Sequence, residues 1–230
     1  MRLSASRTCT VAILALTSLV ATDVARGGVI DVIASTDGYA VDPTGTGVFT
    51  SVNQSPNNFD LSRDNGAGNE ADRALFVFQL PTIPVGAHIE SVSLLGNVNL
   101  IGGANGLPVD FQLTGYTSNG SLAASDATAA GPIVGSVSLP NNAGSLGPIS
   151  IAIDLAFIES KIGSATFIGL TGTVGTNTEL GLVSLNNAFG SPPVPTLEFV
   201  TSAAVPEPGS ITLLALGAVI IGLRRRWLAA

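Results

Sequence analysis

The densest group of oxygen-bearing side chains in this 230-residue chain lies between Asp60 and Asp72. Calcium prefers carboxylate and amide oxygens on a flexible backbone, and two glycines within the stretch supply flexibility. The candidate ligands are Asp60, Asp64, Asn69, Glu70 and Asp72. The stretch is not an EF-hand, because its glycine comes one place late and Ala71 stands at the twelfth position. The sequence suggests calcium as a cofactor here, with a solvated loop of Asx turns as the alternative. A second acidic loop, Asp37 to Pro43, is the next candidate.

Aromatic side chains that could stack on a sugar are few. Tyr39 and Tyr116 are the candidate carbohydrate contacts, because exposed aromatic faces combine an apolar ring with a polar end. The single tryptophan, Trp227, is followed by only three residues in the sequence. An exposed strip of both tyrosines on one sheet would favour carbohydrate binding.

Residues for catalysis are also scarce. His88 is the only histidine and lies in a Pro-Val-Gly-Ala-His segment typical of a turn. There is no Gly-x-Ser-x-Gly motif, and the several histidine or cysteine ligands that zinc needs are missing. Glycoside hydrolysis needs only two carboxylates, so the acidic residues leave it open, although no pair stands out. We predict no catalytic residues and a protein that is not an enzyme.

The C-terminal stretch combines a short motif, an apolar segment and a basic cluster. Residues 211–223 carry no charge, and 13 helical residues reach about 20 Å, against about 30 Å for a bilayer core. The segment is long enough to span only if flanking residues contribute, and the arginines that follow would stay on the cytoplasmic side. A buried core helix is the alternative. The residues in question are Val205, Pro206, Glu207 and Pro208 before the segment, and Arg224, Arg225 and Arg226 after it.

This order and spacing resembles a PEP-CTERM sorting signal over residues 205–230. In that family the tail is held in the inner membrane and recognised by exosortase, a membrane-embedded cysteine transpeptidase. The resemblance implies cleavage at or near the Pro-Glu-Pro and delivery to the cell surface or extracellular matrix of a bacterium. The membrane contact through residues 211–223 would then be transient.

The N-terminus has the three parts of a secretory signal peptide. Arg2 and Arg7 form a positive region, Val11 to Val20 is an apolar run, and small residues follow. Cleavage near Ala21 or after Gly27 would fit, and ten apolar residues are too few for a permanent anchor. We predict a signal peptide over 1–27, export by the secretion machinery, and a working domain over 28–204.

The working domain is acidic and has no cysteine. It contains three basic and fourteen acidic residues, a formal net charge of −11, and Cys9 lies in the signal peptide. Nucleic-acid binding is disfavoured, because it requires clusters of lysine and arginine. The charge is compatible with cation binding, and solubility is the simpler explanation. Arg73, which opens an apolar run, is expected to form a structural ion pair.

Alternating apolar and polar residues indicate strands throughout the domain. The alternating runs are 91–100, 109–114, 149–155 and 197–199, and the run 74–80 is apolar on both faces, as in a covered central strand. Glycine, asparagine and proline clusters separate them at intervals typical of turns. One short helix is expected over Leu155 to Ile162. The pattern predicts an all-β fold, an antiparallel β-sandwich or jelly roll.

A second resemblance covers much of residues 31–200. Asp72 to Leu80, followed by Ile83 to Leu94, is similar to the opening of DNRLRE-type domains. Residues 151–157 and 182–199 are similar to later strands of that family, with Gln79 and Asn186 where acidic residues are common. The family fold is a jelly-roll sandwich of bacterial surface proteins, so the resemblance implies binding or matrix structure.

These patterns lead to an ordered set of functions. We predict an exported cell-surface or matrix protein with a structural or binding role. A carbohydrate-binding module acting on exopolysaccharide is the alternative. A secreted glycan-active enzyme is the third possibility, and two carboxylates about 5 to 10 Å apart in a cleft would favour it.

Overall fold

The computed structural model describes residues 27–54, 58–63, 71–103, 108–140, 147–175, 178–183, 194–202 and 217. Apart from Gly27 and Gly217, the predicted signal peptide and sorting tail lie outside the described residues. The same holds for three predicted calcium ligands, Asp64, Asn69 and Glu70. No helix of the described residues is long and apolar enough to span a membrane.

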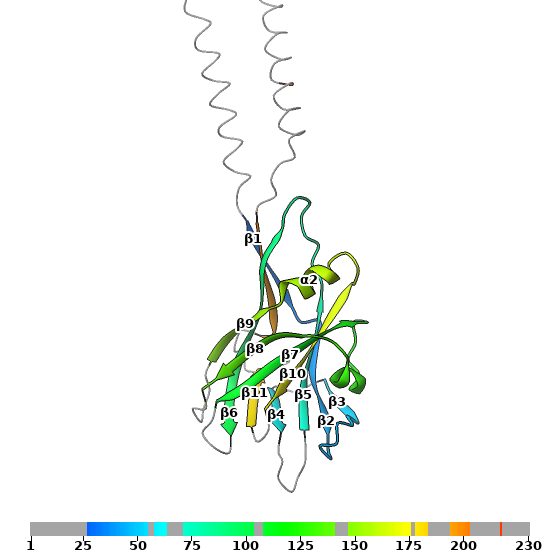
Figure 1. Cartoon of the computed structure of the whole chain (residues 1–230), viewed down its shortest axis with the longest axis vertical. Coiled ribbons are helices and arrows are strands. Elements are labelled where there is room, and N and C mark those ends of the chain that lie inside the picture. Colours follow the sequence, from blue (N-terminus) through cyan, green and yellow to red (C-terminus); the bar gives the residue numbers. More distant parts are fainter. Residues whose placement is uncertain are drawn as a thin grey trace, which may run out of the picture. The chain divides into compact units, whose positions relative to one another are not determined.

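The described chain is mainly β-structure, as predicted (Figure 1). The strands are β1 (Gly28–Ile33), β2 (Thr36–Asp42), β3 (Ser51–Asn53), β4 (Asn58–Arg63), β5 (Ala71–Gln79), β6 (Ile89–Gly103), β7 (Val109–Ser118), β8 (Ile133–Leu139), β9 (Gly147–Ile153), β10 (Phe167–Val174), β11 (Thr178–Val183) and β12 (Thr196–Thr201). The 3₁₀-helix η1 (Ala124–Thr128) follows β7, and the helix α2 (Leu155–Lys161) follows β9, where one short helix is expected from the sequence.

Alternation along the sequence places apolar side chains on one face of each strand. In β7, Val109 and Phe111 are buried, whereas Asp110 and Gln112 between them are exposed. In β5, five consecutive residues from Ala74 to Phe78 are buried, because this strand is covered on both faces. The predicted central strand is therefore confirmed.

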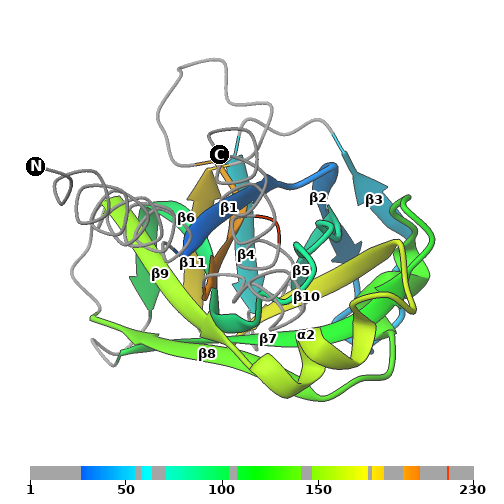
Figure 2. The ribbon, with the colours of Figure 1, turned by 90° about the horizontal axis from the view of Figure 1, so that it is seen from above.

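The strands pair antiparallel wherever their register is described. Hydrogen-bonded neighbours follow the order β1-β12-β6-β11-β4-β5-β10-β7-β8, with β2 and β3 attached beside β5 and β9 beside β6. This one hydrogen-bonded path folds over so that its strands form two packed sheets, consistent with a β-sandwich. In the view from above, β7, β8 and β10 lie on one side and β6, β9 and β11 on another (Figure 2).

The main core lies between the two sheets. Phe76 and Phe78 of β5 are 1% and 0% exposed, and Ile151 and Ile153 of β9 are 1% and 6% exposed. All four belong to one apolar cluster, as the alternation predicts for strands from distant parts of the chain. Burial of such side chains is the dominant favourable contribution to folding.

A second, smaller cluster covers the other face of β5. It consists of Ala40, Leu75, Val77, Leu122 and Ala127, with Phe49, Val52 and Phe167 packed against it. Ala127 belongs to η1, so this cluster fixes that short helix on the outer face of the sheet.

The chain divides into two compact units. Residues 29–82 and 89–200 form one, and residues 1–28, 83–88 and 201–230 form the other. Within the smaller unit the Thr201 hydroxyl accepts from the Gly28 amide at 3.3 Å and donates to the Gly28 carbonyl at 3.0 Å. The Ser202 amide also donates to the His88 carbonyl at 2.8 Å. These bonds bring together residues that are 114 and 173 positions apart in the chain.

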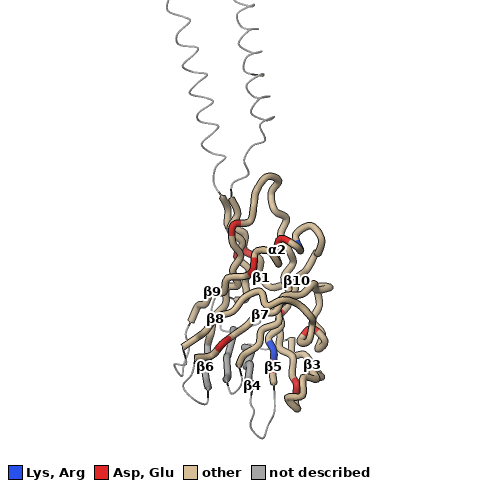
Figure 3. Tube along the Cα trace, in the orientation of Figure 1, with Lys and Arg blue, Asp and Glu red and all other residues tan. Residues whose placement is uncertain are grey.

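The acidic residues that Figure 3 colours lie at several separate places along the chain trace.

Candidate ligand groove

An open groove of about 720 Å³ is built from three segments of the larger unit. The end of β7 contributes one side, the stretch from η1 to Pro132 a second, and α2 with its preceding residue a third; α2 and β7 can be followed in Figures 1 and 2. Its lining residues are Gly115, Tyr116, Thr117, Ser125, Asp126, Ala129, Ala130, Gly131, Pro132, Asp154, Phe157, Ser160 and Lys161. The volume lies within the range of small-molecule sites.

Tyr116 is the buried polar residue of this groove. It is opposite Gly169 in β10, and a Cβ added at Gly169 would stand 2.0 Å from the Tyr116 ring, so the glycine makes room for the ring. The side chain is 7% exposed, and its hydroxyl lies near the Asp126 carboxylate without a hydrogen bond of ordinary distance and angle among the described residues. Burial, together with the nearby negative charge of Asp126, raises the pKa of the Tyr116 phenol, so it is protonated and able to donate.

Two contacts from the sheet hold η1 beside the groove. The Thr171 hydroxyl of β10 donates to the carbonyl oxygen of Asp126 at 2.9 Å. The Arg73 guanidinium donates to the carbonyl oxygen of Ala127 and lies 4.9 Å from the centre of the Phe49 ring. Arg73 thus anchors η1 through these contacts, and the ion pair expected from the sequence stays a prediction.

Both groove carboxylates cap short helices. Asp126 accepts a hydrogen bond from the Ala123 amide at 2.9 Å, and Asp154 accepts one from the Ala156 amide at 2.9 Å. Such caps satisfy amides that have no partner inside the helix. The Lys161 ammonium lies 5.6 Å from the centre of the Phe157 ring. The charged groups of the groove are therefore held in place by local contacts.

The two candidate sugar-binding tyrosines do not form a strip. Tyr39 is opposite Ala74 of β5, whereas Tyr116 is opposite Gly169, which in turn is opposite Val77. Ala74 and Val77 are three residues apart, so they face opposite sides of the sheet. Tyr39 packs against the main core and accepts a hydrogen bond from the Asn53 amide group at 3.2 Å. Only Tyr116 of the pair faces the groove.

The predicted calcium loop is shorter than the sequence suggests. Asp60 lies within β4 and Asp72 within β5, and Arg63 is paired with Ala71 at the hairpin end. The connection 64–70 lies outside the described residues. Among the described residues no group of three or more metal-ligating side chains gathers. The calcium site stays a prediction.

The second acidic stretch is a strand and not a loop. Asp37 and Asp42 belong to β2, which pairs with β5 over seven positions, and both are buried. The Asp42 carboxylate accepts hydrogen bonds from the Thr44 amide and hydroxyl at 3.0 Å and from the Gly47 amide. Both carboxylate oxygens of Asp42 thus accept hydrogen bonds from the connection between β2 and β3, and these bonds stabilise its conformation.

His88 is exposed and lies just after a tight turn, as the sequence predicts. The Ala87 amide donates to the Pro84 carbonyl at 3.0 Å, and Gly86 has a φ of 80°, which glycine adopts without strain. The described contacts of His88 are made by its backbone, which bonds to Ser202.

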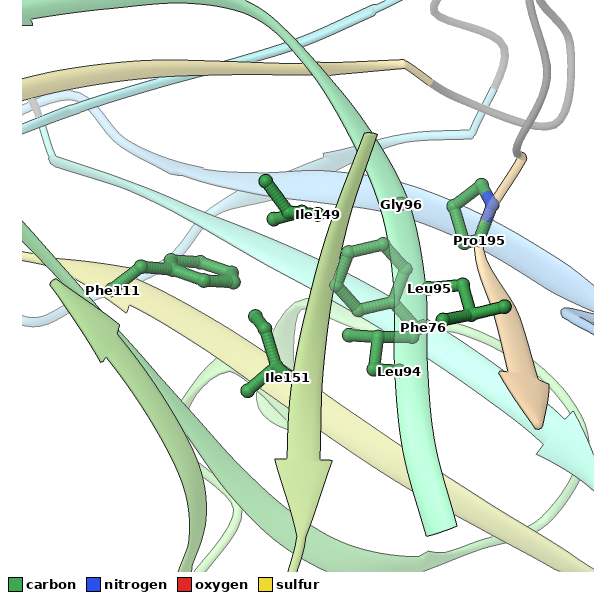
Figure 4. Close-up of a pocket in the computed structure, with 8 residues that line it drawn as sticks. All are labelled: Phe76, Leu94, Leu95, Gly96, Phe111, Ile149, Ile151 and Pro195. Carbon is green, nitrogen blue, oxygen red and sulfur yellow. The ribbon is translucent and has the colours of Figure 1, made fainter. Parts of the chain in front are cut away.

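An apolar cavity lies inside the core and is no ligand site (Figure 4). Its volume is about 10 Å³, and its wall includes Phe76, Phe111, Ile149 and Ile151, whose side chains converge on it. A space of this size is at the lower limit for one water molecule, and an apolar wall offers water no partner.

One comparison with known proteins identifies the C-terminal tail. The family model for the PEP-CTERM protein-sorting motif matches residues 204–226. The chain carries a PEP-CTERM sorting motif. The motif indicates an exported protein whose tail is processed by exosortase, a membrane-associated sorting enzyme. No curated protein matches the chain at a significant level. The resemblance to DNRLRE-type domains stays a prediction.

Sequence patterns identify one groove residue, Tyr116, and miss the others. Asp126 is the one charged residue in a stretch of small side chains, and Asp154 directly precedes the helix α2, so both are recognisable as caps. Nothing in the sequence indicates that these caps lie beside Tyr116.

Proposed function

We propose that this protein is a non-catalytic component of the bacterial cell surface or extracellular matrix. A signal peptide over 1–27 starts its export, and exosortase processing of residues 205–230 completes its sorting. The observation that carries the proposal is the PEP-CTERM motif at residues 204–226. The transient anchor would be the apolar stretch 211–223, with Arg224, Arg225 and Arg226 retained on the cytoplasmic side until cleavage.

The proposal of a non-catalytic role rests on the sequence, which offers no catalytic motif. The groove holds two carboxylates, Asp126 and Asp154, and each uses one oxygen for a helix-capping bond. The carbohydrate-binding alternative does not rest on a tyrosine strip, since Tyr39 and Tyr116 face opposite sides of the sheet.

Mass spectrometry of the protein secreted by its native host tests this proposal. The expected mature species begins after the signal peptide and lacks residues 211–230, and cell fractionation finds it at the surface or in the matrix. A mature protein with an intact C-terminus would overturn the sorting step.

A variant of the tail arginines tests the sorting step further, and a variant with the same charge change in the domain is its matched control. Replacing all three tail arginines, Arg224, Arg225 and Arg226, with glutamine should let the precursor pass through the membrane or insert in the wrong orientation. Arg63→Gln, Arg73→Gln and Lys161→Gln remove the same number of charges from the domain and should leave the processed mass shift unchanged.

A further inference from the structure

The Tyr116 hydroxyl is an unsatisfied buried group beside an open groove. A buried hydroxyl without a hydrogen bond costs free energy, so proteins rarely keep one unless a ligand or water completes it. The ring is fixed by Gly169 behind it, which allows little adjustment toward other protein groups. A ligand group that reaches this hydroxyl would therefore complete a hydrogen bond that the protein forms poorly, and it would meet the Asp126 carboxylate beside it.

Groups around that hydroxyl suit a ligand with many hydroxyls. Asp126 and Asp154 each have a second carboxylate oxygen besides the one used for capping, and Ser125 and Ser160 also line the groove. Carboxylates accept hydrogen bonds, whereas hydroxyls both donate and accept. A sugar supplies both kinds of group within a few ångströms, and hydrocarbon ligands supply neither.

One wall of the groove carries no long side chains. It is formed by small residues and one proline, Ala129, Ala130, Gly131 and Pro132. At Gly131 an added Cβ would stand 1.9 Å from the carbonyl oxygen of Gly115, so this wall is already in close backbone contact with β7. A rigid wall without long side chains leaves space for the face of a sugar ring.

Charge limits which saccharides fit. The groove carries two carboxylates and one ammonium, and the domain has a net charge of −11. Uronic acid or sulfated polymers would be repelled. We propose that this groove, centred on Tyr116 and Asp126, binds neutral saccharides.

This inference deepens the surface and matrix role, because a matrix contains such polymers, and it depends on export only for its biological setting. The binding test uses purified protein, so it can fail while tail processing succeeds, and the reverse. The full chain is purified in a detergent without a sugar head group. Native gels contain dextran, mannan or laminarin as neutral probes, or alginate as the anionic probe.

We expect at least one neutral probe to retard the protein and alginate to have no effect. Tyr116→Phe should weaken that retardation about fivefold, the loss expected for one neutral hydrogen bond. Asp126→Asn, which keeps an acceptor oxygen for Ala123, should weaken it at least as much. Tyr39→Phe is the matched control, since it removes the hydroxyl of the other tyrosine on the opposite face, and it should bind as the unmodified chain does.

Thermal melting separates binding from folding. Tyr116→Phe removes an unsatisfied buried hydroxyl, so its melting temperature should be equal or higher. Three results would overturn the proposal: no retardation by any neutral probe, unchanged retardation in Tyr116→Phe, or equal loss in Tyr39→Phe. Preferential binding of alginate would overturn it as well.

Discussion

Glycines at two strand positions differ in what surrounds them, and alanine substitution should separate them. A Cβ at Gly96 would lie 3.9 Å from the nearest heavy atom, a carbon of Ile149, beside the small apolar cavity. A Cβ at Gly115 would lie 2.6 Å from the Phe157 ring, which is buried. The first site tolerates a methyl group, and the second requires a core aromatic to move.

We therefore predict opposite effects on the free energy of unfolding. Gly96→Ala should raise it by about 0.4 to 1 kcal/mol, because alanine has fewer conformations in the unfolded chain. Gly115→Ala should lower it by about 1 to 3 kcal/mol through overpacking. Urea unfolding of the two variants measures both, and a loss of stability in Gly96→Ala would contradict the geometry.

Asp42 should make the domain sensitive to acid. Burial alone would raise the pKa of its carboxyl, but hydrogen bonds from Thr44 and Gly47 outweigh burial and hold the pKa below its ordinary value of 3.8. A lowered folded pKa contributes stability that is present above the unfolded pKa and is lost as pH falls through the folded pKa.

Asp42→Asn should therefore reduce stability at neutral pH, and the difference from the unmodified chain should shrink below about pH 4. Thermal melts at several pH values measure this. Asp110→Asn, at an exposed position of β7, is the control. A constant difference between pH 7 and pH 2 would mean that the carboxylate charge has no role.

At the scale of elements, the sequence predicts strands well where one face is buried. The alternation in 109–114 and 149–155 corresponds to β7 and β9, because period two places every apolar side chain toward the core. It fails for β2, whose Asp, Gly and Pro-flanked sequence has low strand propensity. Seven paired positions with β5 override that local preference, and no local pattern reports such pairing.

The contact between the two sheets depends on the phenylalanines of β5. Phe76 lies 6.4 Å from Phe78 between ring centres, and both are fully buried in the main core. Phe76→Ala should lower the free energy of unfolding by about 3 to 5 kcal/mol, from lost burial plus the cavity it leaves. Val85→Ala, at a 90% exposed position, is the control and should change stability little. Chemical denaturation compares the two, and a cost under 1 kcal/mol for Phe76→Ala would contradict the described core.

At the scale of the whole molecule, the groove could not be predicted from the sequence. Tyr116, Asp126 and Asp154 are separated along the chain, and their meeting depends on β7, η1 and α2 packing together. The sorting tail could be predicted, because its motif, apolar stretch and basic cluster are contiguous. A motif whose residues are contiguous can be predicted from the sequence, whereas a site whose residues are brought together by strand pairing and packing cannot.

Calcium binding at the β4–β5 hairpin would change the stability of the whole domain. Extracellular calcium modules can have dissociation constants of about 10⁻⁴ to 10⁻³ M. At ten times that concentration binding adds about 1.4 kcal/mol, which a thermal melt shows as a shift of roughly 2 to 5 °C. Magnesium should do less, because it demands octahedral geometry and keeps its water.

The control for this prediction is Asp60→Asn combined with Asp64→Asn, which removes two charges and keeps the amide oxygens. The double variant should lose the shift. A melting temperature that stays constant across millimolar calcium would exclude a stabilising site at this hairpin.

The hydroxyl of Thr201 that both donates to and accepts from Gly28 has a practical consequence. The first and last strands of the domain are neighbours in the sheet, and this hydroxyl holds the start of β1 against the end of β12, so a few glycine and serine residues could join Ser202 to Gly28 directly. New termini could then open at the exposed turn between Pro84 and Ala87. Such a circular permutant should fold, because exposed turns and adjacent ends are the features that circular permutation requires. It would present the groove on a domain whose signal and sorting segments can be attached elsewhere.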